Sequence, residues 1–230
     1  MCGRYSLTTS EEALVGLFEA GSLTGYVSRY NAAPSQILPV VRLDAEGQRQ
    51  WAWLRWGLVP SWTKDPAVGN RMINARAEAV ADKPSFSAAF RRRRCLVAAD
   101  GFYEWQARDG AKQPYHVMTA DGGPIAFAGL WERWGDDAPL ETFTILTTEA
   151  SPDLAPIHHR MPVILAPAHQ STWLETADAG LLAGLLGPGG GTRLVARPVS
   201  RHVNDPRHDD AACLAPVGDN GAPLQILLYR

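Results

Sequence analysis

The sequence has few cysteines, few lysines, little net charge and no long hydrophobic run. Cys2, Cys95 and Cys213 are odd in number and far apart, so they are expected to be reduced thiols rather than a disulfide framework. No apolar run reaches the roughly 18 residues that a spanning helix needs, which excludes a membrane protein. The start, MCGRYSLTTSEE, lacks a basic segment followed by an apolar one. We therefore expect no signal peptide and a cytoplasmic location.

Composition indicates a folded chain of ordinary type. Hydrophobic residues make up 46% and charged residues 20% of the 230 positions, which permits a sizeable core and excludes disorder. The net charge of −2 does not indicate a nucleic-acid binder. The basic residues are nonetheless 19 Arg and only 3 Lys, and the guanidinium fork suits phosphates, although a GC-rich genome explains the same bias. The eight Trp suit a core or stacking on unpaired bases.

Short β-rich segments dominate the pattern. The expected strands are 37–43, 51–58, 95–99, 115–120, 125–130, 141–147, 161–165 and 193–199. The expected helices are 9–18, 84–92, 167–175 and 178–186. Thr9 and Glu12 form a capping-box pattern, and 120–124, ADGGP, predicts a hairpin turn. The GPGGG loop at 187–191 is too short to mark a domain boundary. This pattern favours an α+β fold with a barrel-like sheet.

Cys2 has the most distinctive chemistry. A Cys side chain is small, so Met1 is expected to be removed, which leaves an α-amine beside a thiol. Their unperturbed pKa values are about 8 and about 8.5, so both groups are expected to be partly nucleophilic. An aldehyde condenses with the amine to an imine, and the thiol then closes a thiazolidine ring. Alternatively, Cys2 is an ordinary second residue without a chemical role, in a frayed N-terminus. Gly3 and Arg4 favour the chemistry, because Gly allows close approach and Arg binds phosphate.

Two other segments carry polar groups suited to a site. In an extended chain Asn74, Arg76 and Glu78 share one face, and an amide beside a guanidinium suits sugar and phosphate oxygens. A solvated strand face explains the same pattern. Glu104 stands between two aromatic residues; desolvation there raises the pKa of the carboxyl and suits it to acid–base work. An exposed Glu alternating with core aromatics is the alternative.

Three further motifs have a functional and a structural interpretation. His158 lies in a segment bracketed by prolines, 156–162, and is a candidate proton shuttle. The segment 56–62 is a candidate turn that presents Trp62 to a base, or else core packing. The tract 91–94, four arginines, is interpreted as a solvated helix end rather than a nucleic-acid contact. Because the Cys and His residues show neither CxxC nor HExxH spacing, no metal site is expected.

In combination and in order, these segments closely resemble the SRAP (SOS-response-associated peptidase) family, the abasic-site processing proteins. The matching segments are MCGR, YNAAP, WGLVPSW, INARAE, ADGFYEW, ILTT, HHRMP and VSRHVN. They extend from residue 2 to about residue 217. The resemblance implies a single domain over 1–230, with short helices flanking a mostly antiparallel barrel-like core and a groove for single-stranded DNA.

The resemblance also implies roles for individual residues. After Met1 removal, Cys2 forms a thiazolidine with the ring-opened abasic aldehyde, which shields the lesion from strand cleavage. Asn74 orients the cysteine and sugar, Glu104 accepts and donates protons, and His158 manages sugar protons and reversal. The implied DNA contacts are made by Arg4, Pro34, Trp62, Asn74, Arg76, Thr147 and Arg160. His159 occupies a position that is commonly acidic in the family, and the His-x-Arg spacing favours His158 as the catalytic histidine.

The implied partner is single-stranded DNA containing abasic sites, with no cofactor, no membrane and a monomeric chain, associated with the nucleoid during DNA damage. Removal of its own Met1 is the simplest peptidase activity. Two rival functions remain open. An N-terminal-nucleophile cysteine amidohydrolase also exposes a Cys, and it predicts ammonia release from glutamine. A non-covalent single-strand binder predicts that Cys2→Ala leaves every activity intact.

Overall fold

A closed five-stranded β barrel forms the centre of the molecule. The computed structural model describes residues 2–108, 110–188 and 192–217. The barrel strands are β3 (Ile37–Leu43), β4 (Arg49–Trp56), β6 (Arg94–Ala99), β9 (Ile125–Trp134) and β10 (Leu140–Glu149). They pair in the closed circuit β10–β4–β3–β6–β9–β10, antiparallel except for β10 with β4. Closure leaves these strands without open edges and confirms the expected barrel-like α+β fold.

Aromatic side chains fill the space between the barrel and the strand that crosses it. Trp56 and Phe143 stack with ring centroids 6.1 Å apart, and Tyr5 packs on Trp56 at 5.3 Å. All three are fully buried. The indole nitrogen of Trp56 donates to the carbonyl of Ile73 at 2.8 Å. This bond satisfies the buried indole and fixes the chain just before Asn74.

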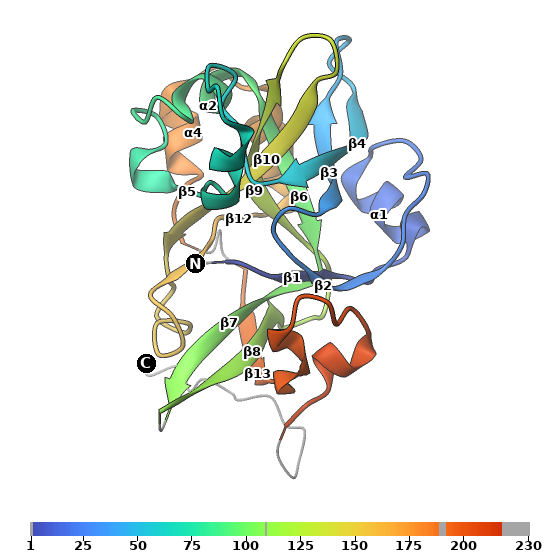
Figure 1. Ribbon diagram of the computed structural model, residues 1–230, viewed down its shortest axis with the longest axis vertical. Coiled ribbons are helices and arrows are strands. Elements are labelled where there is room, and N and C mark those ends of the chain that lie inside the picture. The colour runs from blue at the N-terminus through green and yellow to red at the C-terminus, as the bar shows by residue number, and fades with distance from the viewer. Residues whose placement is uncertain (1, 109, 189–191, 218–230) are drawn as a thin grey trace.

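A second, antiparallel sheet lies against the barrel. Its order is β13–β8–β7–β1–β2, formed by β1 (Tyr5–Leu7), β2 (Arg29–Ala32), β7 (Gly101–Arg108), β8 (Ala111–Thr119) and β13 (Leu194–Pro198). Figure 1 shows β7, β8 and β13 in the lower half, the barrel above them, and β1 crossing between the two. The carboxylate of Asp100, between β6 and β7, accepts hydrogen bonds from the hydroxyls of Thr8 and Thr9 at 2.7 Å each. The second sheet is thereby tied to the barrel wall.

Two of three further short strands place polar residues side by side along β10, and the third pairs with β9. These strands are β5 (Asn74–Arg76), β11 (Arg160–Pro162) and β12 (Ile164–Leu165). β5 runs parallel to β10 with Arg76 opposite Thr147, and β11 runs antiparallel on the other side with Arg160 opposite Glu149. Arg76, Thr147 and Arg160, far apart in the sequence, therefore lie on adjacent strands.

The helices are short and flank the sheets, as the sequence predicts. The α-helices are α1 (Glu11–Phe18), α2 (Ser87–Arg92), α3 (Pro167–Glu175) and α4 (Ala179–Gly184). The 3-10 helices are η1 (Pro66–Arg71), η2 (Ala77–Ala79), η3 (Arg201–Asn204) and η4 (Ala211–Leu214). Within the described ranges, no helix has the length and apolarity that membrane crossing requires. Part of the GPGGG loop, 189–191, and the last residues of the predicted single domain, 218–230, lie outside the described residues.

Three local predictions from the sequence are wrong. The N-cap of α1 is Ser10, whose hydroxyl accepts from the amide of Ala13, because the Thr9 hydroxyl is used by Asp100. The segment 120–124 is a turn but not a hairpin, since β8 and β9 belong to different sheets. The predicted strand 161–165 is two strands, β11 and β12, that pair with different partners.

The arginine tract at 91–94 is only partly solvated. Arg91 and Arg92 are exposed at the end of α2, as predicted. Arg94 is buried instead, and its guanidinium donates to the carbonyls of Trp173, Leu174 and Thr176. These carbonyls form the C-terminal end of α3, where a cation is favourable. Arg94 therefore joins α3 to the barrel.

Candidate active site

Cys2 lies buried at the entry to β1, fixed by its neighbours. Its side chain is fully buried in the core, and its sulfur lies 3.9 Å from the carbonyl oxygen of Arg4. The amide nitrogen of Asn74, at the start of β5, donates to the Cys2 carbonyl at 2.8 Å. This hydrogen bond gives Asn74 an orienting contact with the cysteine. Met1 lies outside the described residues, so its removal stays a prediction.

Burial raises the pKa of the Cys2 thiol, and the negative charge of Glu104 raises it further. With Met1 still attached, the thiol is therefore protonated at neutral pH. The sequence-based expectation of a partly nucleophilic thiol concerns the chain without Met1 and stays a prediction. Use of the sulfur as a nucleophile requires that a nearby base take its proton.

Glu104 on β7 has the properties of such a base. Its side chain is buried, with 4% of the residue exposed, and burial raises the pKa of its carboxyl. Glu104 lines a small cavity together with Phe102, Val117, Leu154, Ile157, His158 and Arg160. The raised pKa and its cause, desolvation, are as predicted.

An open cleft lies beside this cavity. It has a volume of about 440 Å³ and is lined by Glu104, Trp105, Lys112, His158 and Asn204. The indole nitrogen of Trp105 donates to the side-chain oxygen of Asn204 at 2.7 Å. This bond joins β7 and η3, which form two walls of the cleft. Sequence reasoning did not select Lys112 or Asn204. Asn204 ends the VSRHVN segment, and Lys112 is one of only three lysines.

His158, and not His159, faces Glu104. The Nδ1 atom of His158 is 3.9 Å from the Glu104 carboxylate, and it accepts a hydrogen bond from the amide of Arg160 at 3.0 Å. Burial lowers the pKa of His158, so its ring is largely neutral at pH 7 and suited to accept a proton. His159 is exposed and stacks on His158 with ring centroids 4.5 Å apart. The histidine that the His-x-Arg spacing favours is therefore the one that lies beside Glu104, and its catalytic role stays a prediction.

Arg76 and Arg160 flank one carboxylate. Arg160 forms a two-pronged ion pair with Glu78, at 2.7 and 3.0 Å, and also reaches the backbone and hydroxyl of the buried Thr147. Hydrogen bonds from Arg160, followed by the charges of Arg160 and Arg76, lower the pKa of Glu78. Arg76 is exposed on β5. A phosphate at this point meets Arg76 directly but competes with Glu78 for Arg160.

Arg4 has partners within the protein. Its guanidinium donates to the side-chain oxygen of Asn31 and the carbonyl of Val203 at 3.0 Å each, and to the carbonyl of Asn204 at 3.4 Å. Arg4 thus links β1, next to Cys2, with the η3 wall of the cleft. A phosphate at Arg4 would share the guanidinium with these acceptors.

The two residues expected to contact bases lie on loops. Trp62, between β4 and η1, is 65% exposed, which a core residue would not be. Pro34 is half-buried in the turn between β2 and β3, where Ser35 has a φ of 71°. The structure therefore brings together Cys2, Asn74, Glu104 and His158, and sets Trp62 at the surface.

Comparison with known proteins finds relatives that align with most of this sequence. The abasic site processing protein YoaM of Bacillus subtilis is 38% identical over 222 residues, covering 93% of this chain and 97% of YoaM. HMCES of Gallus gallus, also named an abasic site processing protein, is 33% identical, covering 87% of this chain and 69% of HMCES. YedK of Escherichia coli, with the same description, is 30% identical and covers 94% of this chain and 100% of YedK.

Solved structures share the fold. A crystal structure from Bordetella bronchiseptica has a TM-score of 0.76 at 29% identity and covers 86% of this chain and 100% of its own. One from Bacteroides thetaiotaomicron has a TM-score of 0.83, covering 94% and 100%; its 24% identity supports the fold alone. The family model described as SOS response associated peptidase (SRAP) matches residues 1–206. This chain therefore belongs to the SRAP family.

Proposed function

We propose that this protein processes abasic sites by forming a covalent thiazolidine between Cys2 and the open aldehyde of the lesion in single-stranded DNA. The observation that carries the proposal is the convergence of Asn74, Glu104 and His158 around Cys2. The names of the relatives, abasic site processing proteins, agree with it. Removal of Met1 supplies the amine that the chemistry requires.

The reaction consists of sugar opening, imine formation and ring closure. Glu104 takes the proton of the C1′ hydroxyl, and the neutral His158 accepts this proton and passes it to the ring oxygen, which opens the sugar to its aldehyde. The α-amine of Cys2 adds to the aldehyde carbon and one water leaves, giving an imine. The sulfur then adds to the same carbon, and the thiol proton passes to the nitrogen. The sequence loses one water in total and needs no cofactor.

Burial of Cys2 and Glu104 suits this sequence of steps. The open aldehyde is a small fraction of an abasic sugar, so an acid–base pair beside the nucleophile raises the capture rate. The raised pKa of Glu104 makes it a stronger base when ionised and places its titration closer to neutrality. The charge of Glu104 already acts on the Cys2 thiol, so the same carboxylate is suited to take the thiol proton.

Non-specific contacts hold the strand. Arg76 and Arg160 bind phosphates, and Arg160 exchanges one or both of its bonds with Glu78 for bonds to the strand. Trp62 is exposed for base stacking, which is tolerant of sequence because every base presents a π face. A net charge near zero is compatible with this binding, because the strand responds to the local charge of the groove.

A crosslinking assay tests the proposal against its two rivals. Protein mixed with an abasic single-stranded oligonucleotide should give a species of reduced mobility that survives denaturing electrophoresis, whereas an intact oligonucleotide should give none. Ammonia release from glutamine without a crosslink would instead identify an amidohydrolase. DNA binding without either reaction would identify a non-covalent binder.

His158→Ala should slow sugar opening and crosslink reversal, whereas His159→Ala should have a mild effect. Only His158 faces the Glu104 carboxylate; His159 is an exposed ring stacked on its outer side. Loss of one acid–base group is expected to cost on the order of 100-fold in rate. The measurement is a quenched time course of crosslinking and of release into competitor DNA. A larger defect in His159→Ala would reverse the assignment and leave the Cys2 chemistry standing.

Arg76→Ala and Arg160→Ala should each reduce the salt dependence of DNA binding. Each phosphate contact contributes about 0.7 to the slope of log K against log salt for a single strand. Arg160→Ala should weaken binding more, because it leaves Glu78 facing the strand without its partner. Fluorescence anisotropy over a salt series gives the slopes. Arg193→Ala is the control. Arg193 is exposed beside the last residue of β8, whereas Lys112, which lines the cleft, lies near the first residue of that strand. Slopes equal to the wild-type value in both variants would remove these residues from the groove.

A further inference from the structure

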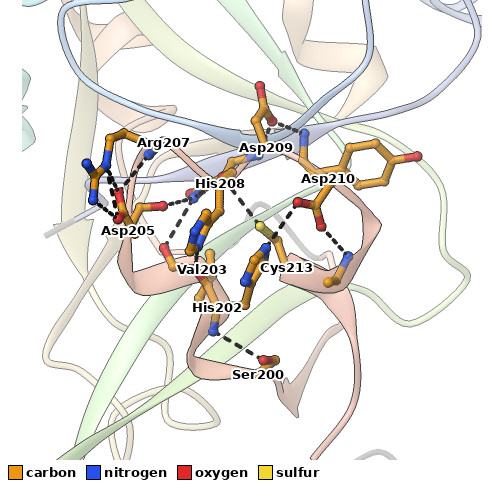
Figure 2. A network of polar contacts seen from close by, with 12 residues as sticks. Ser200, His202, Val203, Asp205, Arg207, His208, Asp209, Asp210 and Cys213 are labelled. Carbon is orange, nitrogen blue, oxygen red and sulfur yellow. Dashed lines mark hydrogen bonds and ion pairs between the residues drawn. The ribbon is translucent and has the colours of Figure 1, made fainter.

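A compact cluster of His, Asp and Cys side chains lies outside the proposed active site. It is formed by η3, η4 and the loop 205–210 between them. The Nε2 atom of His202 is 3.0 Å from a carboxylate oxygen of Asp210, and both residues offer a ligand atom within 4.8 Å of one on Cys213. Figure 2 shows the three side chains directed toward one another from the two 3-10 turns.

Backbone hydrogen bonds hold each member in position. The hydroxyl of Ser200 caps η3 by accepting from the amide of His202 at 3.1 Å. One oxygen of Asp210 caps η4 by accepting from the amide of Ala212 at 2.8 Å, so its other oxygen is directed to the cluster. The Cys213 sulfur lies 3.5 Å from the carbonyl oxygen of His208. The positions of the three side chains are therefore fixed by the turns themselves.

His208 supports the cluster as a second layer. Its ring lies parallel to that of His202, with centroids 3.8 Å apart and an interplanar angle of 5°, and its Nδ1 atom is 2.9 Å from the His202 carbonyl oxygen. This stack fixes the plane of the His202 ring. Metal-binding imidazoles are normally oriented by a hydrogen bond from their second ring nitrogen; here the stack on His208 orients the ring.

We propose that His202, Asp210 and Cys213 bind a zinc-type divalent cation. An imidazole nitrogen, a carboxylate oxygen and a thiolate sulfur are all zinc ligands, with bonds of about 2.0 to 2.3 Å. Around a tetrahedral ion such ligands are roughly 3.3 to 3.8 Å apart, so the observed cluster needs only small adjustments. Binding breaks the His202–Asp210 hydrogen bond and releases the thiol proton of Cys213 to solvent. Water completes the fourth position, since Asp210 is exposed.

The charge around the cluster favours this assignment. The neighbouring carboxylates already have arginine partners: Asp209 pairs with Arg29 at 2.7 Å, and Asp205 pairs with Arg207 at 2.5 Å. Asp210 is instead paired with a histidine, which an incoming cation is able to displace. The spacing of the three ligands matches no common zinc motif, which explains why sequence reasoning expected no metal.

The site is placed to stabilise a wall of the proposed cleft. η3 carries Asn204, which lines the cleft and bonds to Trp105, and its carbonyls accept from Arg4. A cation that joins η3 to η4 would hold this wall in place. The role inferred is structural and does not depend on the chemistry of Cys2.

Metal titration of the full-length protein tests the proposal. After chelator treatment and buffer exchange, zinc binding is measured by elemental analysis, and cobalt(II) serves as a spectroscopic probe. We expect one equivalent of metal and, with cobalt, a thiolate-to-metal charge-transfer band. Cys213→Ser keeps a hydroxyl that bonds to the His208 carbonyl. This variant should lose the charge-transfer band and weaken zinc affinity by on the order of 100-fold or more. Such a loss exceeds the usual effect of removing a residue that only supports a ligand. Asp210→Asn, which keeps the cap on η4, should also weaken it.

Two comparisons distinguish the loss of a zinc ligand from a loss of folding and from zinc binding at other sites. His169→Gln replaces an exposed histidine of α3 and should bind zinc as the wild type does. The melting temperature of metal-free Cys213→Ser should match that of the metal-free wild type, whereas zinc should raise only the wild-type value. Wild-type protein that binds less than a tenth of an equivalent in excess zinc, or equal binding by Cys213→Ser, would overturn the proposal.

Discussion

Replacement of Cys2 by alanine is expected to abolish the heat-stable covalent adduct with abasic single-stranded DNA while leaving non-covalent binding to intact DNA largely unchanged. The adduct requires an amine and a thiol on the same residue, and alanine retains only the amine. Cys2→Ser should give at most a labile imine, because a hydroxyl does not supply the ring-closing sulfur. The measurement is denaturing electrophoresis with and without heating. A heat-stable adduct from the serine variant would refute the thiazolidine mechanism.

Cys95→Ala is the matched control for loss of a thiol. Cys95 is fully buried in the barrel strand β6, opposite Gly129 of β9, and has no part in the proposed reaction. The smaller side chain should cost roughly 1 kcal/mol of folding stability through a small cavity. The variant should nevertheless form the adduct at the wild-type yield once it is folded.

Glu104→Gln should slow adduct formation by on the order of 100-fold or more, with a much smaller effect on DNA affinity. Glutamine keeps the size of the side chain and one acceptor, but it neither takes nor gives a proton near neutral pH. Crosslinking rates from a quenched time course, set beside affinities from anisotropy, separate the two effects. An equal loss in rate and affinity would make Glu104 a binding residue rather than an acid–base group.

The same variant should lose one limb of the pH–rate profile. If ionised Glu104 is the base, the wild-type rate falls as pH decreases through its pKa. Because burial raises that pKa, the fall should begin at a higher pH than the ordinary value for Glu, about 4.3, would give. Glu104→Gln has no carboxyl to titrate, so the part of the fall that comes from Glu104 should be absent, and only the titration of His158 should remain.

Sequence patterns predicted the long barrel strands well and the short strands of the site poorly. β3 has the predicted bounds, 37–43, because seven residues are enough to show an apolar pattern. β1 and β5 have three residues each, which is too short for an alternating pattern to predict a strand. β7 is not among the strands that the sequence predicts, because it begins with a glycine, Gly101. A side chain at Gly101 would lie 2.4 Å from the Val117 carbonyl, so glycine is needed there for close strand approach.

The candidate active-site residues can be selected from the sequence, but their partners cannot. Asn74 and Glu104 were identified from short alternating segments, and β5 and β7 place them near Cys2. The bonds from Arg4 to η3 and from Arg160 to Glu78 join residues 199 and 82 positions apart. Local pattern carries no information about such pairs. The raised pKa of the Cys2 thiol has the same origin, since it depends on burial by distant segments.

Intact mass spectrometry of the wild-type protein, alone and after mixing with abasic single-stranded DNA, tests the central claim most directly. The mechanism predicts a free chain that lacks Met1, and a new species with the summed mass of that chain and the DNA less one water. Proteolysis of the adduct should place the DNA on the peptide that begins with Cys2. An adduct on a chain that retains Met1, or no covalent species at all, would contradict the proposed chemistry.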